Sequence, residues 1–237
     1  MNREVIKSIA MVTMTLNHIA AVFMKPDSWL YYLFCGIGYF TGVVMINFIL
    51  EGYQYTSSRK RYFLRLLSFG LLSQFPFVFA FPNNGGRLNM MFSLCICFGI
   101  IWAIEELDNT LYQVVVITIA FILSFYCDWP LLAPVLTLLL YWAKKSPGIK
   151  ALPQCIFIVI FWLFLWLFQF WDLQEVFSFS RNLLYSMLSI TGVVMAFLIL
   201  HLFYNGKLKQ NRSAFSKWFF YVFYPLHLIV IGIVERI

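Results

Sequence analysis

The sequence predicts an all-α membrane protein, a bundle of about nine helices that takes up nearly the whole chain. Of its 237 residues, 62% are hydrophobic and only 11% are charged, whereas a soluble domain carries roughly twice that share of charge. The hydrophobic residues are also gathered into segments long enough to cross a hydrocarbon layer of roughly 30 Å. We therefore expect residues 1–237 to form a single integral membrane domain.

Nine segments have the length and hydrophobicity of membrane-spanning helices. They cover residues 5–24, 29–50, 62–81, 88–105, 110–127, 129–143, 152–171, 183–204 and 217–234. The sixth is the weakest because it is short and is crossed by Pro130 and Pro134, so a kinked or re-entrant segment is the alternative there. The first follows Arg3 and Lys7 as a signal peptide would, but its apolar run is long and no A-x-A pattern follows it, which favours a permanent helix.

The basic residues fall mainly on one side of this predicted topology. One side holds the N-terminus and the loops after the second, fourth, sixth and eighth helices, with Arg3, Lys7, Arg59, Lys60, Arg61, Arg65, Lys144, Lys145, Lys150, Lys207, Lys209, Arg212 and Lys217. The other side holds only Lys25, Arg87, Arg181 and Arg236. The positive-inside rule then places the N-terminus in the cytoplasm. The net charge of +7 follows from the same rule, so we expect membrane lipids and not nucleic acid as the partner.

The five cysteines are Cys35, Cys95, Cys97, Cys127 and Cys155. They lie in or at the ends of apolar segments, they lack the spacing of a metal site, and an odd number gives no disulfide framework. We interpret them as small buried side chains and expect no metal.

Lys7 and His18 are the first candidates for function, because an ionisable side chain inside a membrane segment is costly. They are 11 residues apart, which on a helix puts them on one face and about 16 Å apart along the axis. This geometry suits a long anionic ligand that enters from the cytoplasm, with its phosphates at Lys7 and its far end at His18. The alternative is that Lys7 is a snorkelling anchor and His18 bonds to a neighbouring helix.

A second group of candidates joins the second and third predicted helices. Glu51 ends one helix, and Arg59, Arg61 and Arg65 begin the other. Arg65 lies a full turn inside the helix, where a lone guanidinium is costly, so a partner such as Glu51 is expected. A cluster of arginines also binds phosphate through bidentate hydrogen bonds. The alternative for this group is simple contact with lipid headgroups.

The remaining polar candidates lie farther along the chain. Gln74 precedes Pro76 in the third predicted helix, and Asn89 opens the fourth. His227 lies in the run Tyr224-Pro225-Leu226-His227 of the ninth, at a depth near that of His18. Pro225 breaks the local hydrogen-bond ladder, which marks either a structural kink or the wall of a site.

Two further polar residues are expected near the membrane surface. Asp128 comes before Pro130, a pattern that starts a helix, so an exposed capping residue is predicted there. His201 falls at the end of the eighth predicted helix, where an interfacial residue is expected.

At these residues the chain resembles the TraX family of membrane proteins, whose namesake N-acetylates the pilin subunit of conjugative pili. The matching residues are Lys7, Thr13-Met14, Asn17-His18-Ile19-Ala20, Glu51-Gly52-Tyr53, Arg59-Lys60-Arg61-Tyr62, Leu64-Arg65-Leu66, Gln74-Phe75-Pro76, Leu88-Asn89, Phe92-Ser93-Leu94, Asp128 and Phe223-Tyr224-Pro225-Leu226-His227-Leu228. The chain departs from the family at Asn17, where an aspartate is common, so an acid role at this position is in doubt. There is also a weaker similarity to membrane acyltransferases of the acyltransferase-3 type, which carry a basic residue, usually arginine, and a histidine 11 positions apart on the first helix.

The resemblance implies a membrane-embedded acetyl- or acyltransferase with cytoplasmic acetyl-CoA as its donor substrate. It implies that the CoA phosphates meet Lys7, Arg59, Arg61 and Arg65, with Glu51 in the same group. His18 would be the general base, because an imidazole suits proton transfer at neutral pH. Direct transfer and a covalent acetyl-histidine relay both fit.

Other residues receive supporting roles in the same hypothesis. His227 would orient His18 or shuttle the proton, and Asn89, Gln74 or Tyr224 would donate to the developing oxyanion. The acceptor would be a membrane-associated peptide, a lipoprotein terminus or an envelope glycan. A chain of this kind is expected in the bacterial plasma membrane as a multi-pass protein.

Two other functions stay open from the sequence. A small transporter or permease would also place polar residues among membrane helices, but no inverted repeat is visible and the ionisable residues cluster toward one half of the predicted membrane. A non-enzymatic membrane partner that immobilises a peptide or a complex is the third possibility.

Overall fold

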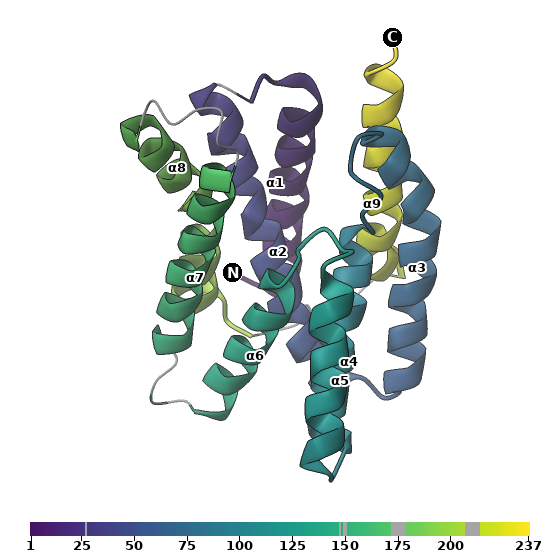
Figure 1. Cartoon of the computed structure of the whole chain (residues 1–237). Helices are drawn as coiled ribbons and strands as arrows, with labels where there is room; N and C mark the ends of the chain where they lie inside the picture. Colours follow the sequence, from purple (N-terminus) through teal and green to yellow (C-terminus); the bar gives the residue numbers. More distant parts are fainter. Residues whose placement is uncertain (27, 147, 149–150, 172–178, 207–213) are drawn as a thin grey trace. The chain divides into compact units, whose positions relative to one another are not determined.

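The computed structural model describes residues 1–26, 28–146, 148, 151–171, 179–206 and 214–237. Helices account for most of the described chain (Figure 1). They are α1 (Arg3–Phe23), α2 (Trp29–Tyr55), α3 (Arg59–Ala80), α4 (Met90–Glu106), α5 (Thr110–Ser124), α6 (Leu132–Lys145), α7 (Ala151–Trp171), α8 (Phe179–Leu198) with the π-helical η2 (Ile199–Phe203), and α9 (Ala214–Val234). Each of the nine predicted segments coincides with one helix, with the largest differences at the end of α2 and the start of α8.

The protein is an all-α membrane protein, as predicted. Four of the described helices are long and apolar enough to cross a membrane, namely Arg3–Phe23, Trp29–Tyr55, Arg59–Ala80 and Leu183–Phe203. The stretches Thr110–Ser124, Ala151–Leu167 and Trp218–Val234 are apolar but shorter. Nine spans and a cytoplasmic N-terminus stay predictions, and Lys150, Lys207, Lys209 and Arg212, which entered the orientation argument, lie outside the described residues.

Side-chain caps explain where several helices begin. The side-chain oxygen of the residue before the helix accepts a hydrogen bond from a free backbone N–H group of the first turn, which would otherwise be unsatisfied. Asn2 accepts from Val5 in this way, Ser58 from Arg61, Asn89 from Met91 and Asn109 from Leu111. The starts of α1, α3, α4 and α5 are therefore fixed by local sequence.

The chain divides into two compact units. The first contains residues 1–44 and 154–220, and the second contains residues 45–153 and 221–237. The helices α2, α7 and α9 each contribute to both units. The sequence-based prediction of a single membrane domain stays a prediction.

Close backbone contact holds the first unit together. A Cβ atom added at Gly192 of α8 would lie 2.0 Å from the carbonyl oxygen of Gly36 in α2, and one added at Gly36 would lie 2.3 Å from that of Leu188. Small residues allow membrane helices to approach in this way, where dispersion contacts replace the hydrophobic effect. Between α1 and α2, Thr41 donates to the carbonyl of Ala10 at 2.6 Å, and Thr13 lies 2.9 Å from the Thr41 hydroxyl.

We expect Gly192→Ala to destabilise the protein by about 1–3 kcal/mol or more, because the added methyl group can be accommodated only if the two helix backbones move apart. The matched control is Gly99→Ala in α4, where an added Cβ meets nothing within 4 Å. That change is expected to be neutral or to stabilise by about 1 kcal/mol through helix propensity. Thermal unfolding in detergent checks both, and equal midpoints for the two variants would contradict the close approach.

In the second unit α4 packs against α3, α5 and α6. The ring of Phe98 in α4 is surrounded by Tyr53, Tyr62, Phe63 and Trp102. The helices α3 and α9 run side by side (Figure 1), with Phe69 and Tyr221 in ring contact at 4.8 Å. A Cβ atom at Gly232 would lie 2.5 Å from the ring of Phe79.

Candidate functional site

The predicted site residues are distributed over the two units. Lys7 and His18 belong to α1 in the first unit. The others belong to the second unit and are Glu51, Arg59, Arg61, Arg65, Gln74, Asn89, Tyr224 and His227.

On α1, His18 is buried, with 9% of its surface exposed, and Lys7 is half-buried. The helix also buries Arg3 to 8% exposure, although the sequence suggested a basic residue ahead of the membrane segment. Arg3 precedes Lys7 by four residues, so both cations lie on the same side of the helix as His18. A cationic start and a buried imidazole therefore share one face of a candidate membrane helix.

Asn17 has a structural role that the sequence did not reveal. Its side-chain N–H donates to the carbonyl oxygen of Cys35 at 3.0 Å. A Cβ atom at Gly38 would lie 2.2 Å from the Asn17 side chain, so the amide is seated directly against α2. A carboxylate has no hydrogen to donate, and an aspartate at this position could not make the same bond. Asn17 thus ties α1 to α2 instead of supplying an acid.

Gln74, Asn89 and Tyr224 are brought together at the start of α4. The Asn89 side-chain N–H groups donate to the carbonyl of Gly70 and to Gln74 Oε1, both at 2.8 Å. Gln74 Oε1 also accepts from the Asn89 backbone at 3.0 Å, and Gln74 Nε2 donates to the carbonyl of Arg87 at 3.0 Å. Tyr224 joins this group because its hydroxyl accepts from the Met90 backbone N–H at 3.3 Å.

These bonds distinguish the three predicted oxyanion donors. Both side-chain hydrogens of Asn89 are used, and its Oδ1 accepts from Met91 at 3.0 Å, so Asn89 holds the helix start in place. Gln74 keeps one amide hydrogen. The Tyr224 hydroxyl, on a side chain only 2% exposed, donates to no acceptor in the described part of the chain, and a hydroxyl can donate as well as accept. Gln74 and Tyr224 therefore each keep a hydrogen to donate, and Tyr224 is the more buried of the two.

His227 lies one turn beyond Phe223 on α9. Its Nδ1 is 2.9 Å from the Phe223 carbonyl oxygen, and a carbonyl can only accept, so Nδ1 carries the hydrogen. The imidazole also stacks on the Phe223 ring, with centroids 5.1 Å apart. In the neutral ring the basic nitrogen is then Nε2. The ring is buried, and its orientation is fixed by its own helix.

Asp128 corrects a sequence-based expectation. The helix α6 begins at Leu132, with no side-chain cap, so Asp128 is not the predicted exposed cap. It is half-buried in the segment between α5 and α6, where Leu88 N–H donates to the Tyr126 carbonyl at 2.7 Å. Burial raises the pKa of Asp128 to about 6, against the opposing effect of the Arg87 charge. Nearby, Leu131 has a φ of 59°, a left-handed conformation that is strained for a leucine and is found most often at functional sites.

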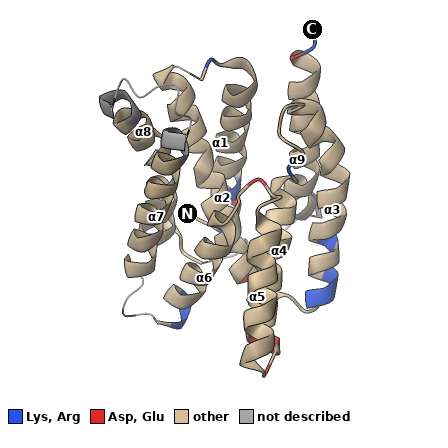
Figure 2. Cartoon of the chain, viewed as in Figure 1, with Lys and Arg blue, Asp and Glu red and all other residues tan. Residues whose placement is uncertain are grey.

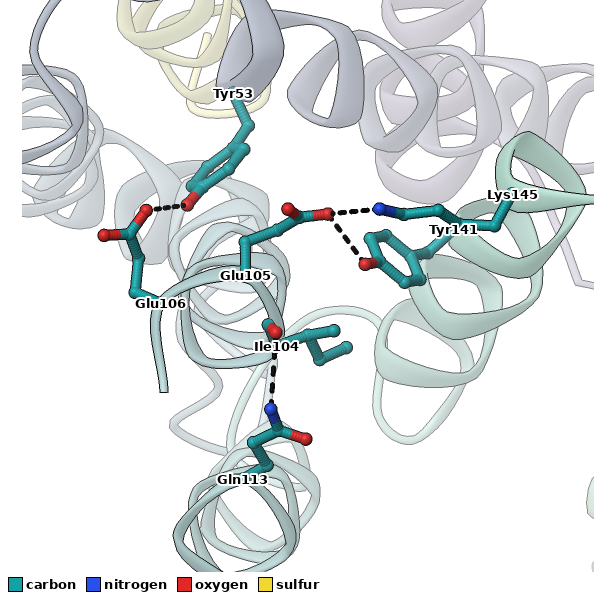
Figure 3. A network of polar contacts seen from close by, with 7 residues as sticks. All are labelled: Tyr53, Ile104, Glu105, Glu106, Gln113, Tyr141 and Lys145. Atoms are coloured by element: carbon teal, nitrogen blue, oxygen red, sulfur yellow. Dashed lines mark hydrogen bonds and ion pairs between the residues drawn. The ribbon is translucent and has the colours of Figure 1, made fainter. Parts of the chain in front are cut away.

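The acidic residues at the end of α4 hold the start of α3 and the end of α6. Arg59 forms an ion pair with Glu106, which also accepts from the Tyr53 hydroxyl at 3.3 Å. The neighbouring Glu105 accepts from Tyr141 at 2.7 Å and pairs with Lys145 at 3.1 Å. Figure 3 shows the two carboxylates pointing to different partners, and Figure 2 shows the basic residues gathered at these two helix ends.

We expect Glu105→Gln and Glu106→Gln each to cost up to about 1 kcal/mol of stability, because all four charged groups are partly exposed and solvent screens them. Their partners are separate, so the double variant should equal the sum of the single variants to within about 0.5 kcal/mol. Unfolding midpoints at low and high salt test this, and the losses should shrink at high salt. A double variant no worse than one single variant would show that the two pairs act as a single network.

Arg65 differs from the sequence-based expectation of a Glu51 partner. Its guanidinium lies over the ring of Tyr62 at 4.9 Å and over that of Tyr221 at 5.5 Å. Glu51 instead accepts from Asn47 at 3.3 Å. Arg61, one turn before Arg65, is exposed.

Among the described residues, no group of three or more His, Cys, Asp or Glu side chains could hold a metal ion. The five cysteines are free thiols. Three of them, Cys95, Cys97 and Cys127, are buried, but Cys155 is exposed.

These observations define the class of protein as a helical membrane protein whose buried polar residues lie within its apolar helices. A family model described as TraX protein matches residues 2–235, and the chain belongs to the TraX family. The chain is also 28% identical over 239 residues to the "Probable fimbrial assembly protein FimC, serogroup H1" of Dichelobacter nodosus, a match that covers 95% of this chain and 92% of that protein. No solved structure matches the chain.

Proposed function

We propose that the protein is a membrane acetyl- or acyltransferase that moves an acetyl group from cytoplasmic acetyl-CoA to the amine or hydroxyl of a membrane-associated acceptor. The observation that carries the proposal is His18, a buried imidazole in a candidate membrane helix with Arg3 and Lys7 on the same face. A buried ionisable group in such a helix is costly and calls for a functional reason. Membership of the TraX family supports the proposal, and the bacterial plasma membrane is the proposed location.

In the proposed reaction the acceptor nitrogen or oxygen attacks the thioester carbonyl while His18 takes its proton. The C–S bond then breaks, and the CoA thiolate leaves with that proton, so that the products are the acetylated acceptor and free CoA. The imidazole returns to its neutral form at each turnover, as a general base must. A covalent acetyl-histidine relay would use the same residue as the nucleophile.

The other predicted residues keep supporting roles in the proposal. Binding of CoA phosphates is proposed for Lys7 in the first unit and, separately, for Arg59, Arg61 and Arg65, with Glu51 in the same group, in the second unit. In the second unit Tyr224 is the proposed hydrogen-bond donor to a developing oxyanion, and Gln74 and Asn89 fix the helix start from which Tyr224 takes its bond. His227 orients the reacting groups or shuttles a proton through its Nε2.

The name of the Dichelobacter nodosus relative suggests which acceptor to test first and also supplies a second candidate function. That relative is named a fimbrial assembly protein, so a membrane peptide is the first acceptor to try, with an envelope molecule as the next. The same name would also fit a non-enzymatic membrane partner that holds a fimbrial subunit during assembly. Such a partner needs no acyl donor, so donor binding separates the two candidates.

The deciding experiment is the thermal unfolding of the purified protein in detergent with and without acetyl-CoA. A ligand that binds the folded state raises the free energy of unfolding by RT ln(1 + [L]/Kd), about 2.7 kcal/mol at 100 times its Kd, and the unfolding midpoint rises with it. We expect millimolar acetyl-CoA to raise the midpoint and adenosine, which lacks the phosphates and thioester, not to do so. No shift with a well-folded preparation would overturn the donor part of the proposal and favour the assembly partner.

A further inference from the structure

Arg65 is an exposed charged residue in α3, an apolar helix. It lies six residues after Arg59, about 9 Å along the helix axis at 1.5 Å per residue, in a helix long and apolar enough to span a membrane. Exposed apolar side chains follow it on that helix, among them Leu71 and Leu72. A guanidinium in such a position is costly unless a counter-charge reaches it.

The Arg65 guanidinium is held in position by two aromatic rings. Tyr62 on its own helix and Tyr221 on α9 both lie within 6 Å of the guanidinium carbon, the range of a cation–π contact. Tyr221 is itself fixed by its ring contact with Phe69. Aromatic rings engage the faces of a guanidinium and leave the N–H groups at its edge free to donate.

Two other arginines of the second unit also lie over aromatic rings, and each of them has the oxygen acceptor that Arg65 lacks among the described residues. Arg59 lies over the Tyr53 ring and pairs with Glu106. Arg236 lies over the Phe79 ring and donates to the Phe79 carbonyl at 2.9 Å and to Glu235 at 3.1 Å. Arg65 is exposed and forms no hydrogen bond or ion pair with any residue in the described ranges. The Arg65 guanidinium lies over aromatic rings as those of Arg59 and Arg236 do, but it has no oxygen acceptor in the described part of the chain.

We propose that Arg65, framed by Tyr62 and Tyr221, is the centre of a binding site for a phosphate ester. The planar guanidinium presents parallel N–H groups that match two phosphate oxygens, and such bidentate pairs are the stronger class of charge-assisted hydrogen bond. Arg61, one turn before it, adds a second cation, which suits a group with more than one negative charge. Tyr62 and Tyr221 are positioning residues, because the guanidinium lies over both of their rings.

Two sources could supply this phosphate. A phospholipid headgroup reaches the start of a membrane helix laterally, whereas a soluble phosphate ester such as CoA reaches it from the aqueous side. Both would satisfy the same N–H groups, and the site stands on the Arg65 geometry whether or not the transferase proposal is correct.

The test compares Arg65→Lys with Arg236→Lys. Lysine keeps the charge but loses the planar fork, so the variant is expected to fold. Arg236→Lys is the matched control, since it makes the same exchange at an arginine that already has protein acceptors. The first measurement is the amount of phospholipid that stays bound to the protein after purification in detergent. The second is the shift of the unfolding midpoint with CoA and with inorganic pyrophosphate.

We expect the wild type and Arg236→Lys to respond alike and Arg65→Lys to lose most of the response, by about tenfold in apparent affinity, the effect of one lost charge-assisted bond. A loss confined to retained phospholipid assigns the site to a lipid headgroup, and a loss confined to CoA and pyrophosphate assigns it to a soluble ester. The proposal is overturned if Arg65→Lys matches the wild type in both measurements, or if Arg236→Lys loses as much. Absence of any acetyl-CoA effect on the wild type, with phospholipid still lost in Arg65→Lys, would count against the transferase proposal alone.

Discussion

Replacing Asp128 with asparagine is expected to stabilise the protein at neutral pH. The carboxyl is half-buried, and burial raises its pKa to about 6 from an ordinary value of 3.8. Above that pH the folded protein must keep a charge that is better solvated in the unfolded chain. Asparagine has nearly the same shape and no charge, so the variant avoids this penalty, which at about 1.4 kcal/mol per pKa unit is at most about 3 kcal/mol.

The raised pKa of Asp128 also determines how the stability difference between the two proteins changes with pH. Between pH 3.8 and about 6 the folded state binds more protons at Asp128 than the unfolded state does, so stability falls as pH rises through this window. The midpoint of Asp128→Asn should therefore equal that of the wild type near pH 4 and exceed it most above pH 6. Unfolding in detergent at several pH values measures the difference, with the exposed Asp108 of the α4–α5 connection changed to asparagine as the control. A difference that does not vary with pH would contradict the raised pKa.

A stability cost that is retained in a folded protein points to a use. Asp128 lies three residues before Leu131, which has a strained backbone. Strain and a perturbed acid group together are features of functional sites. If the Asp128→Asn variant is more stable but inactive in cells, the protein keeps the destabilising Asp128 carboxylate because its function requires it.

The helices could be predicted because their signals are local. Each helix in the described part of the chain coincides with a predicted apolar segment, and the capping residues Asn2, Ser58 and Asn89 stand directly before helices in the sequence. The burial of Asp128 could not be predicted in this way. It depends on the pairing of the 126–128 segment with Leu88, and the Pro130 pattern alone suggested an exposed cap.

The candidate site shows the same division between local and distant information. Spacing along α3 correctly put Arg61 and Arg65 one turn apart. The partner of Arg59, Glu106, is 47 positions away in the sequence, and spacing along one helix does not predict it. The contact between Arg65 and Tyr221 joins α3 to α9. The sequence around Arg65 does not show whether its partner is a carboxylate, such as that of Glu51, or a pair of aromatic rings.

The polarity of Gln74, Asn89 and Tyr224 predicted part of their role but not all of it. Their polarity within apolar helices indicated that they matter, and the structure brings them together, with Tyr224 reaching Met90 across 134 positions. Polarity did not indicate which of them keeps a hydrogen to donate. That depends on the acceptors Gly70 and Arg87, which are backbone carbonyls and leave no trace in the sequence.

His18→Ala is expected to have the largest effect on activity. If His18 is the general base, its loss should reduce acetyl transfer by about 10²–10⁴-fold, the usual contribution of such a group. The acetyl-CoA effect on the unfolding midpoint should persist, because in the proposal the CoA phosphates are bound by the cations and not by the imidazole. Transfer of radiolabelled acetyl from acetyl-CoA into the protein and lipid fractions of membranes measures the first quantity, and thermal unfolding measures the second.

The matched control for this prediction is His201→Ala, because His201 is an exposed histidine in the π-helical turn of the same unit and has no proposed role. Equal folded yields of the two variants would show that His18→Ala loses transfer because the reaction is impaired and not because the protein fails to fold. Transfer that survives in His18→Ala at the wild-type rate would remove the base from the mechanism, even if acetyl-CoA still binds. Transfer and acetyl-CoA binding lost together, in a well-folded variant, would mean that the imidazole holds the donor, and the general base would then have to be sought at His227 or Asp128.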